Sequence, residues 1–236
     1  ISTILLYTKY IKRKRILFMK TLVINAHPGF TNHEHFSVQL QDKFIELYHT
    51  HYPEKDLTIM NLYEEDIPRI EATSLWSVWD KQAAGKELSS TESKIAERSQ
   101  FLLEQFKAHQ RVVVSTPLHN FNITSRMKDY IDNLMIARET FRYLAEPDEQ
   151  GKVSEGLMRD NYKMLMLFAS GSVYTADSIY KSVDIAPHYM QTIFQEMMGF
   201  DDFQLVRAEG TATQDKDRIL NTAFTDLEQK FSSFYQ

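Results

Sequence analysis

RVVVSTPLHNFNITSRMKDYIDNLM, residues 111–135, is the stretch that decides the fold. It opens with a continuous β-branched run and passes through a loop rich in turn-forming residues. It then continues as an apolar stripe at helical spacing, formed by Met127, Ile131, Leu134 and Met135. A strand joined by a short polar loop to an amphipathic helix is the repeating unit of α/β proteins. The stretch therefore predicts a strand, a loop and a helix that packs on a sheet.

The same alternation continues on both sides of this stretch. Short aliphatic or β-branched runs lie at 21–26, 57–62, 111–116, 163–169 and 203–208. Most are continuously apolar, as expected of parallel strands covered on both faces. Helical stripes occur at Phe36, Leu40, Phe44 and Leu47, at Ile95, Leu102, Leu103 and Phe106 behind a Ser89–Glu92 capping box, and at Leu220, Phe224, Leu227 and Phe231. The sequence therefore predicts one α/β domain with a buried parallel sheet.

Composition narrows the chemistry. The chain has 236 residues, a formal charge of -5 and no cysteine. Without cysteine there is no disulfide, thiolate metal site or cysteine nucleophile. The negative balance argues against nucleic acid as a partner. No run approaches the ~20 apolar residues of a membrane-spanning helix, so no membrane partner is expected.

The first residues differ in character from the rest of the chain. Residues 1–18 are basic and apolar, and they precede Met19 and Lys20, after which the first predicted strand begins. They match no core pattern. We therefore expect an N-terminal extension at 1–18, outside a single domain that spans 19–236.

The loop after the first run, residues 26–37, reads AHPGFTNHEHFS and leads directly into a predicted helix. Ligands of open α/β sheets bind outside the carboxyl ends of the strands, and a helix start favours phosphate. Neither G-x-G-x-x-G nor G-x-x-x-x-G-K-[ST] is present. Two interpretations stay open, namely phosphate binding, or a helix capped by Asn32 or Ser37 with solvated histidines. His33 and His35 lack the spacing of a helical metal site, so no metal is predicted.

Two further segments carry a family resemblance. Residues 117–132, PLHNFNITSRMKDYID, and 139–143, ETFRY, closely resemble the P-x-[YH]-N-[FW] loop with its helix and the T-F-[RK]-Y segment of FMN-dependent NADH azoreductases. Residues 26–28 and 35–37 resemble the first loop of the related NAD(P)H quinone reductases. The resemblance extends more weakly from Met19 to the C-terminus. It implies a flavodoxin-like three-layer α/β fold that binds FMN, with a five-stranded parallel sheet in the order 2-1-3-4-5.

The resemblance also implies cofactor-binding residues by position. In these families the first loop holds the FMN phosphate, the second runs beside the ribityl chain and ring, and the loop after the fourth strand completes the ring site. The residues implied are His27, His35, Phe36 and Ser37, then Leu118, His119, Asn120 and Phe121, then Ser170, Gly171, Ser172 and Val173. Azoreductases usually have serine in place of His35 and a Gly-rich turn in place of 170–173. The first loop is also longer than theirs.

The implied function is that of an FMN-dependent NAD(P)H oxidoreductase. Such an enzyme takes hydride from NADH or NADPH and passes two electrons to a quinone, azo or nitroaromatic acceptor by a ping-pong mechanism. Because the flavin carries the chemistry, no catalytic acid or base is predicted. The alternative is a flavodoxin-type electron carrier without its own substrate. Carriers are usually strongly acidic for docking, whereas this chain has a pI near 5.9.

The segment at 63–90 is longer than a usual connection and contains both tryptophans. The three-residue spacing of Trp76 and Trp79 predicts a short helix with both rings on one side, in core or at an interface. The families that the chain resembles are dimers with active sites at the subunit interface. We therefore expect a homodimer, and the lack of cysteine fits a cytoplasmic location.

Overall fold

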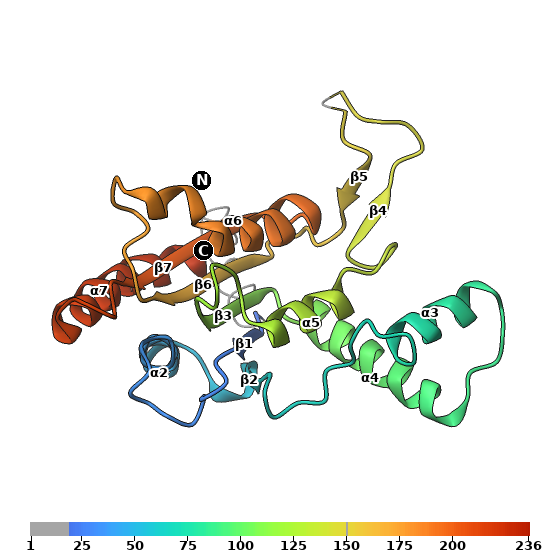
Figure 1. Ribbon diagram of the computed structural model, residues 1–236, viewed down its shortest axis with the longest axis horizontal. Coiled ribbons are helices and arrows are strands. Elements are labelled where there is room, and N and C mark those ends of the chain that lie inside the picture. Colours follow the sequence, from blue (N-terminus) through green and yellow to red (C-terminus); the bar gives the residue numbers. More distant parts are fainter. Residues whose placement is uncertain (1–18, 150) are drawn as a thin grey trace, which may run out of the picture.

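Five parallel strands form the central sheet of the protein (Figure 1). The computed structural model describes residues 19–149 and 151–236, and the predicted extension at 1–18 lies outside these ranges. The strands are β1 (Thr21–Asn25), β2 (Leu57–Asn61), β3 (Arg111–Pro117), β6 (Lys163–Ser170) and β7 (Asp202–Glu209). Each is parallel to its neighbours, and they match the five predicted runs to within one residue at each end.

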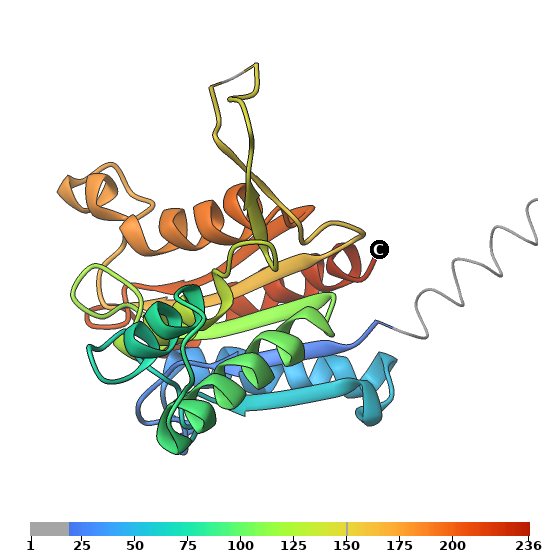
Figure 2. The same cartoon turned by 90° about the vertical axis from the view of Figure 1, so that its right-hand side faces the viewer.

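The strand order across the sheet is β2-β1-β3-β6-β7, which corrects the predicted numbering 2-1-3-4-5. Two short strands, β4 (Phe141–Tyr143) and β5 (Ser154–Gly156), come between β3 and β6 in the chain and form an antiparallel hairpin. These strands are not predicted from the sequence, because three residues are too few to show an alternating pattern. Figure 2 shows the hairpin projecting from the body of the protein.

Glycine anchors the base of this hairpin. A Cβ atom at Gly156 would lie 2.2 Å from the carbonyl carbon of Met198, so only glycine permits the close backbone approach. The N–H of Met158 donates to the carbonyl oxygen of Met198 at 2.8 Å. The hairpin is therefore held at its base by backbone contacts that no local pattern in its sequence reveals.

Helices cover both faces of the sheet. One face carries α2 (Phe36–His51) and α7 (Lys216–Phe234), and the other carries α4 (Ser90–Lys107), α5 (Ser125–Leu134) and α6 (Ile185–Gln191). Side chains alternate along the strands: Val23 and Val113 belong to the α2–α7 core, whereas Leu22 and Val112 belong to the opposite core. This confirms the prediction of a sheet buried on both faces.

Three short helical segments complete the structure: η1 (Glu54–Asp56), η2 (Ile179–Val183) and the π-helical η3 (Thr192–Met197), which continues α6. No pattern in the sequence predicts α6 or η3. Across the described part of the chain, no helix has both the length and the apolar composition needed to cross a membrane.

Helix α4 begins where the sequence predicts. Ser89 Oγ accepts the N–H of Glu92 at 3.3 Å, and the Glu92 carboxylate accepts the N–H of Ser89 at 2.8 Å, which confirms the capping box. The same carboxylate contacts Lys81 Nζ at 2.7 Å and Ser77 Oγ at 2.6 Å. These donors, Lys81 foremost, lower the pKa of Glu92. Helix α3 (Leu75–Ala83) is thereby attached to the start of α4.

The two tryptophans of α3 do not share one environment. Trp79 is partly buried and lines a cavity of about 120 Å³ between α3 and α4. Trp76 is 60% exposed. Positions three apart on a helix differ by about 60° in direction. Helix α3 packs against α4, so the ring of Trp79 faces α4 while that of Trp76 points into solvent.

Candidate functional site

The loops after β1, β3 and β6 meet at the carboxyl edge of the sheet, because these three strands are neighbours in it. This edge lies at the left in Figure 2. The predicted site residues lie in these loops or in the first turn of α2, except Ser170, which is the last residue of β6. The tertiary structure thus brings the three sets of predicted site residues to one edge of the sheet. Their contact with a cofactor stays a prediction.

The first loop is organised around two histidine rings. The imidazoles of His27 and His35 stack with their centroids 4.0 Å apart and their planes inclined by 25°. Gly29 makes room for this stack, since a Cβ atom there would lie 2.9 Å from His35 Nε2. The N–H of Gly29 donates to His27 Nδ1 at 2.9 Å. The two stacked rings therefore form one continuous surface on the first loop.

The environment of His27 keeps its ring neutral. Burial, followed by the charges of His35 and His119, lowers the pKa of His27 from 6.5 to about 4. Because Nδ1 accepts the N–H of Gly29, the proton of the neutral ring lies on Nε2. That N–H is a donor suited to an anionic ligand.

A buried polar floor lies below the first loop. Ser37 and Asn25 are each 1% exposed. Neither Ser37 Oγ nor Asn25 Nδ2 has a hydrogen-bond partner among residues 19–149 and 151–236. Buried polar groups are nearly always paired, so these two atoms mark a place for an external partner. Asn25 is absent from the sequence prediction, although a polar residue that ends an apolar strand is a signal that could have found it.

Helix α2 starts at this floor without a side-chain cap. Its N-cap residue, His35, makes no capping hydrogen bond, and the Ser37 carbonyl accepts Ser115 Oγ from β3 at 2.7 Å. The first N–H groups of a helix are unpaired within it and carry partial positive charge. Together with the Ser37 hydroxyl and the His27 ring, they fit a phosphate group.

The second loop turns sharply between His119 and Asn122, whose backbone groups exchange two hydrogen bonds of 2.9 Å each. The central residues, Asn120 and Phe121, adopt left-handed φ values of 47° and 66°. Asparagine tolerates this conformation, but for a residue such as phenylalanine it costs about 1 kcal/mol. The Phe121 side chain is 47% exposed. The turn therefore presents an apolar ring to solvent at the carboxyl edge.

The third loop is supported by the segment that follows β7. The carbonyl oxygens of Ser170, Gly171 and Ser172 accept the N–H groups of residues 211, 212 and 210 at 3.1, 3.1 and 3.2 Å. Ser170 Oγ also donates to the Ser172 carbonyl oxygen at 2.9 Å. The pairing of β6 with β7 thus continues beyond both strands and shapes this loop.

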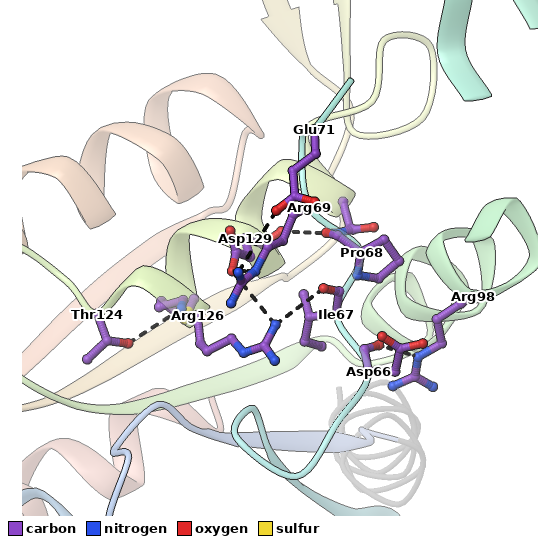
Figure 3. Close-up of polar contacts among 11 residues, drawn as sticks. Asp66, Ile67, Pro68, Arg69, Glu71, Arg98, Thr124, Arg126 and Asp129 are labelled. Atoms are coloured by element: carbon purple, nitrogen blue, oxygen red, sulfur yellow. Dashed lines mark hydrogen bonds and ion pairs between the residues drawn. The ribbon is translucent and has the colours of Figure 1, made fainter. Parts of the chain in front are cut away.

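Long-range polar contacts connect the 63–90 segment to α5, which follows the second loop, and to α4 (Figure 3). Arg69 Nε contacts Asp129 at 3.1 Å, and Arg126 Nη1 lies 3.4 Å from the carbonyl oxygen of Ile67. Arg98 Nε donates to the carbonyl oxygen of Asp66 at 2.7 Å. Such partly exposed contacts contribute at most about 1 kcal/mol each. The sequence prediction misses them, since the partners lie far apart in the chain.

A hollow of about 730 Å³ extends from the third loop along β7 and α7. Val173 is the predicted site residue that lines it, with Thr175 and Glu209 close by. Its cations already have partners: Lys230 is paired with Asp226 at 2.7 Å, Arg207 is paired with Asp184, and Arg218 donates to Gln214 at 2.6 Å. The chemistry of the three loops, rather than this hollow, therefore defines the candidate site.

The three loops combine two kinds of surface. The first offers imidazole, hydroxyl and helix N–H donors, and the second offers Leu118 and Phe121 beside the amide of Asn120. A phosphate-bearing ligand with a flat apolar ring and a polar edge needs both kinds of surface. FMN is such a ligand, and the residues present fit it.

Fold and site together define a protein of the flavodoxin-like class, and the family model described as a flavodoxin-like fold matches residues 19–231. The chain is 45% identical over 218 residues to FMN-dependent NADH:quinone oxidoreductase 1 of Lactiplantibacillus plantarum, covering 92% of this chain and 99% of that one. It is 46% identical over 217 residues to the FMN-dependent NADH:quinone oxidoreductase of Streptococcus agalactiae, with coverages of 92% and 99%. The chain belongs to this family of FMN-dependent NADH:quinone oxidoreductases.

A solved structure has the same architecture. It is an FMN-dependent NADH-azoreductase from Bacillus anthracis in complex with FMN, with a TM-score of 0.83 and 40% sequence identity. The similarity covers 92% of this chain and 100% of that chain. The resemblance to azoreductases and quinone reductases that the motifs indicate is confirmed.

Proposed function

We propose that this protein is an FMN-dependent oxidoreductase that transfers electrons from NADH to quinones and azo compounds. The observation that carries the proposal is the buried, unpartnered Ser37 hydroxyl of the described chain, at the uncapped start of α2 beside the His27–His35 stack. The names of relatives with 45% and 46% identity include FMN, NADH and quinone. The chemistry of the site and the sequence similarity to these relatives therefore both support FMN as the cofactor.

In this proposal the residues of the chain bind FMN and orient the two substrates. His27, His35, Phe36 and Ser37 hold the phosphate, and residues 118–121 and 170–173 line the ribityl chain and ring. FMN would supply the two-electron chemistry when bound. The contribution of the chain is to bring the nicotinamide and the acceptor within contact distance of the ring and to keep water away. Neither task requires a side chain that exchanges protons.

We extend the proposal to a ping-pong order of substrates and to nitroaromatic acceptors. Both substrates have to contact the same ring, and the exposed second loop offers one surface for both. Sequential occupation of one surface produces ping-pong kinetics. Flat aromatic acceptors suit an opening bordered by Phe121.

We also propose a homodimer in the cytoplasm, with two active sites at the subunit interface. Among the exposed large aromatic side chains of the described residues are Trp76 (60%), Phe121 (47%) and Tyr143 (71%). Interfaces are enriched in aromatic residues of this kind. Helix α3 and the β4–β5 hairpin lie toward the same end of the molecule in Figure 1. A second copy that covers this end would shield the ring from water.

Anaerobic stopped-flow spectroscopy of the purified holoprotein tests the function. We expect flavin absorbance that NADH bleaches without an acceptor and that menadione or methyl red then restores. Initial rates at several NADH concentrations should form parallel lines in double-reciprocal plots. A protein that purifies without flavin and binds none on reconstitution would refute the proposal. Bleaching only in the presence of acceptor would refute the ping-pong order alone.

A further inference from the structure

Glu209, the last residue of β7, reaches across to the segment that follows β6. Its carboxylate accepts the N–H of Tyr174 at 2.8 Å and the N–H of Thr175 at 3.3 Å. The Thr175 hydroxyl donates closely to the other oxygen of the same carboxylate. Hydrogen bonds to an ionised acceptor are stronger than those between neutral groups. One side chain therefore fixes two consecutive residues of another part of the chain.

These residues follow the third loop of the candidate site without a gap. Residues 170–172 are already bonded through their carbonyl oxygens to the N–H groups of 210–212. Gly210, with φ of +81°, allows the backbone to turn there immediately after Glu209. The loop is thus held on its carbonyl side by the backbone beyond β7, and at its end by the Glu209 carboxylate.

A second side chain of β7 holds the far end of the same segment. Arg207 Nη1 donates to Asp184 Oδ1 at 3.1 Å, and its other terminal nitrogen contacts the second oxygen. Arg207 and Glu209 are two positions apart on a strand, so they point to the same face. One strand therefore anchors residues 174–184 at both ends, but only Glu209 does so next to the third loop.

We propose that Glu209 is a positioning residue for the flavin ring. By fixing Tyr174 and Thr175, it holds Ser172 and Val173 in the place where they contact the ring. The inference rests on the proposed function, and it assigns Glu209 a role that the sequence motifs do not. Because the ring is common to FMN and riboflavin, and the phosphate is not, loss of Glu209 should weaken both ligands equally.

Binding of FMN and riboflavin to reconstituted apoprotein, followed by flavin fluorescence, tests the inference. We expect Glu209→Ala to weaken both ligands by the same factor, about tenfold. Glu209→Gln, which retains acceptor oxygen without charge, should weaken both by about threefold and so restore part of the affinity. Asp184→Asn, which loosens only the far end of the segment, is the matched control and should leave both affinities unchanged.

Several outcomes would overturn the inference. A lower unfolding temperature with unchanged flavin affinity in both Glu209 variants would show a purely structural role. Weaker FMN binding with unchanged riboflavin binding would move the effect to the phosphate. If Glu209→Ala does not fold, the Glu209→Gln measurement decides alone. A wild-type protein that binds neither flavin would instead refute the proposed function, so the two failures are distinguishable.

Discussion

The first and second loops leave the same edge of the sheet but are held in opposite ways. In the first loop the Ser37 side chain is buried, the His27 and His35 rings stack on each other, and a long helix starts at once. In the second, Phe121 is 47% exposed on a backbone with φ of 66°. The first loop is therefore packed within the single chain and lacks only a partner for the Ser37 hydroxyl. The second loop exposes an apolar ring on a strained backbone.

This difference separates the two halves of cofactor recognition. A buried donor set at a helix start selects a small anion without rearrangement. An exposed ring on a strained turn gains most when another surface covers it. We therefore expect phosphate affinity to depend on the single chain, and ring affinity to depend on the second loop and on a second copy. The following variants test this division, in order of decreasing effect.

Ser37→Asp should have the largest effect. A carboxylate at this buried position repels the phosphate, so FMN affinity should fall by more than about 100-fold. Riboflavin has no phosphate and should bind as it does to the wild type. Fluorescence titration with both ligands measures the contrast. Ser125→Asp, at an exposed helix start, is the control, and full FMN affinity in Ser37→Asp would refute the phosphate site.

Phe121→Gly should weaken FMN and riboflavin alike, by about tenfold, through loss of the aromatic contact with the ring. Thermal stability should not fall, because glycine relieves about 1 kcal/mol of left-handed strain. Calorimetry together with flavin titration measures both quantities. Lower stability combined with unchanged flavin affinity would show that Phe121 supports the fold rather than the ring.

His27 should make stability depend on pH. Its pKa is about 4 in the folded chain and 6.5 when unperturbed, so the unfolded chain takes up the proton first as the pH falls. The contribution is therefore present above pH 6.5 and is lost as the pH falls from 6.5 toward about 4. We expect a loss of about 1 kcal/mol, allowing for partial exposure of the ring.

Urea denaturation of the wild type and of His27→Gln at pH 7 and pH 4.5 isolates this contribution. Other groups also titrate in this range, so the difference between the two proteins is the relevant quantity. The variant should lose less stability than the wild type on acidification. Equal losses in the two proteins would contradict the assignment.

Trp76→Asp should weaken the proposed dimer and reduce quinone turnover by about threefold, because an exposed interface aromatic is replaced by a charge. The affinity for FMN should change less than turnover, because the phosphate site lies within the single chain. Sedimentation velocity and menadione reduction test the pair of effects. Trp79→Asp is the contrasting variant, and it should lower stability, since Trp79 is partly buried against α4. A wild-type monomer with full activity would refute the interface.

Removal of residues 1–18 should have the smallest effect. A complete strand begins at Thr21, and the family model matches from residue 19. A chain that starts at Met19 should be soluble, bind FMN and unfold at the same temperature as the full chain. Insolubility of the shortened chain would show that the extension belongs to the domain.

Local patterns in the sequence predict much of this structure. The five strand runs, the helix that begins at the Ser89–Glu92 box and the three site loops all follow from residues that are near one another in the chain. Their signals are strong because apolar periodicity and capping act over a few residues. The P-x-[YH]-N-[FW] segment at 117–121 adds the family, since its residue types follow each other without interruption.

Only the tertiary structure decides what depends on distant contacts. The β4–β5 hairpin depends on the close contact of Gly156 with Met198. The Glu209 carboxylate accepts hydrogen bonds from Tyr174 and Thr175, which precede it by 35 and 34 positions in the chain. The buried, unpartnered Ser37 hydroxyl and the lowered pKa of His27 likewise arise from packing around them. Sequence determines the elements because their preferences are local. It does not reveal which polar atoms remain unsatisfied, because that depends on every group packed against them.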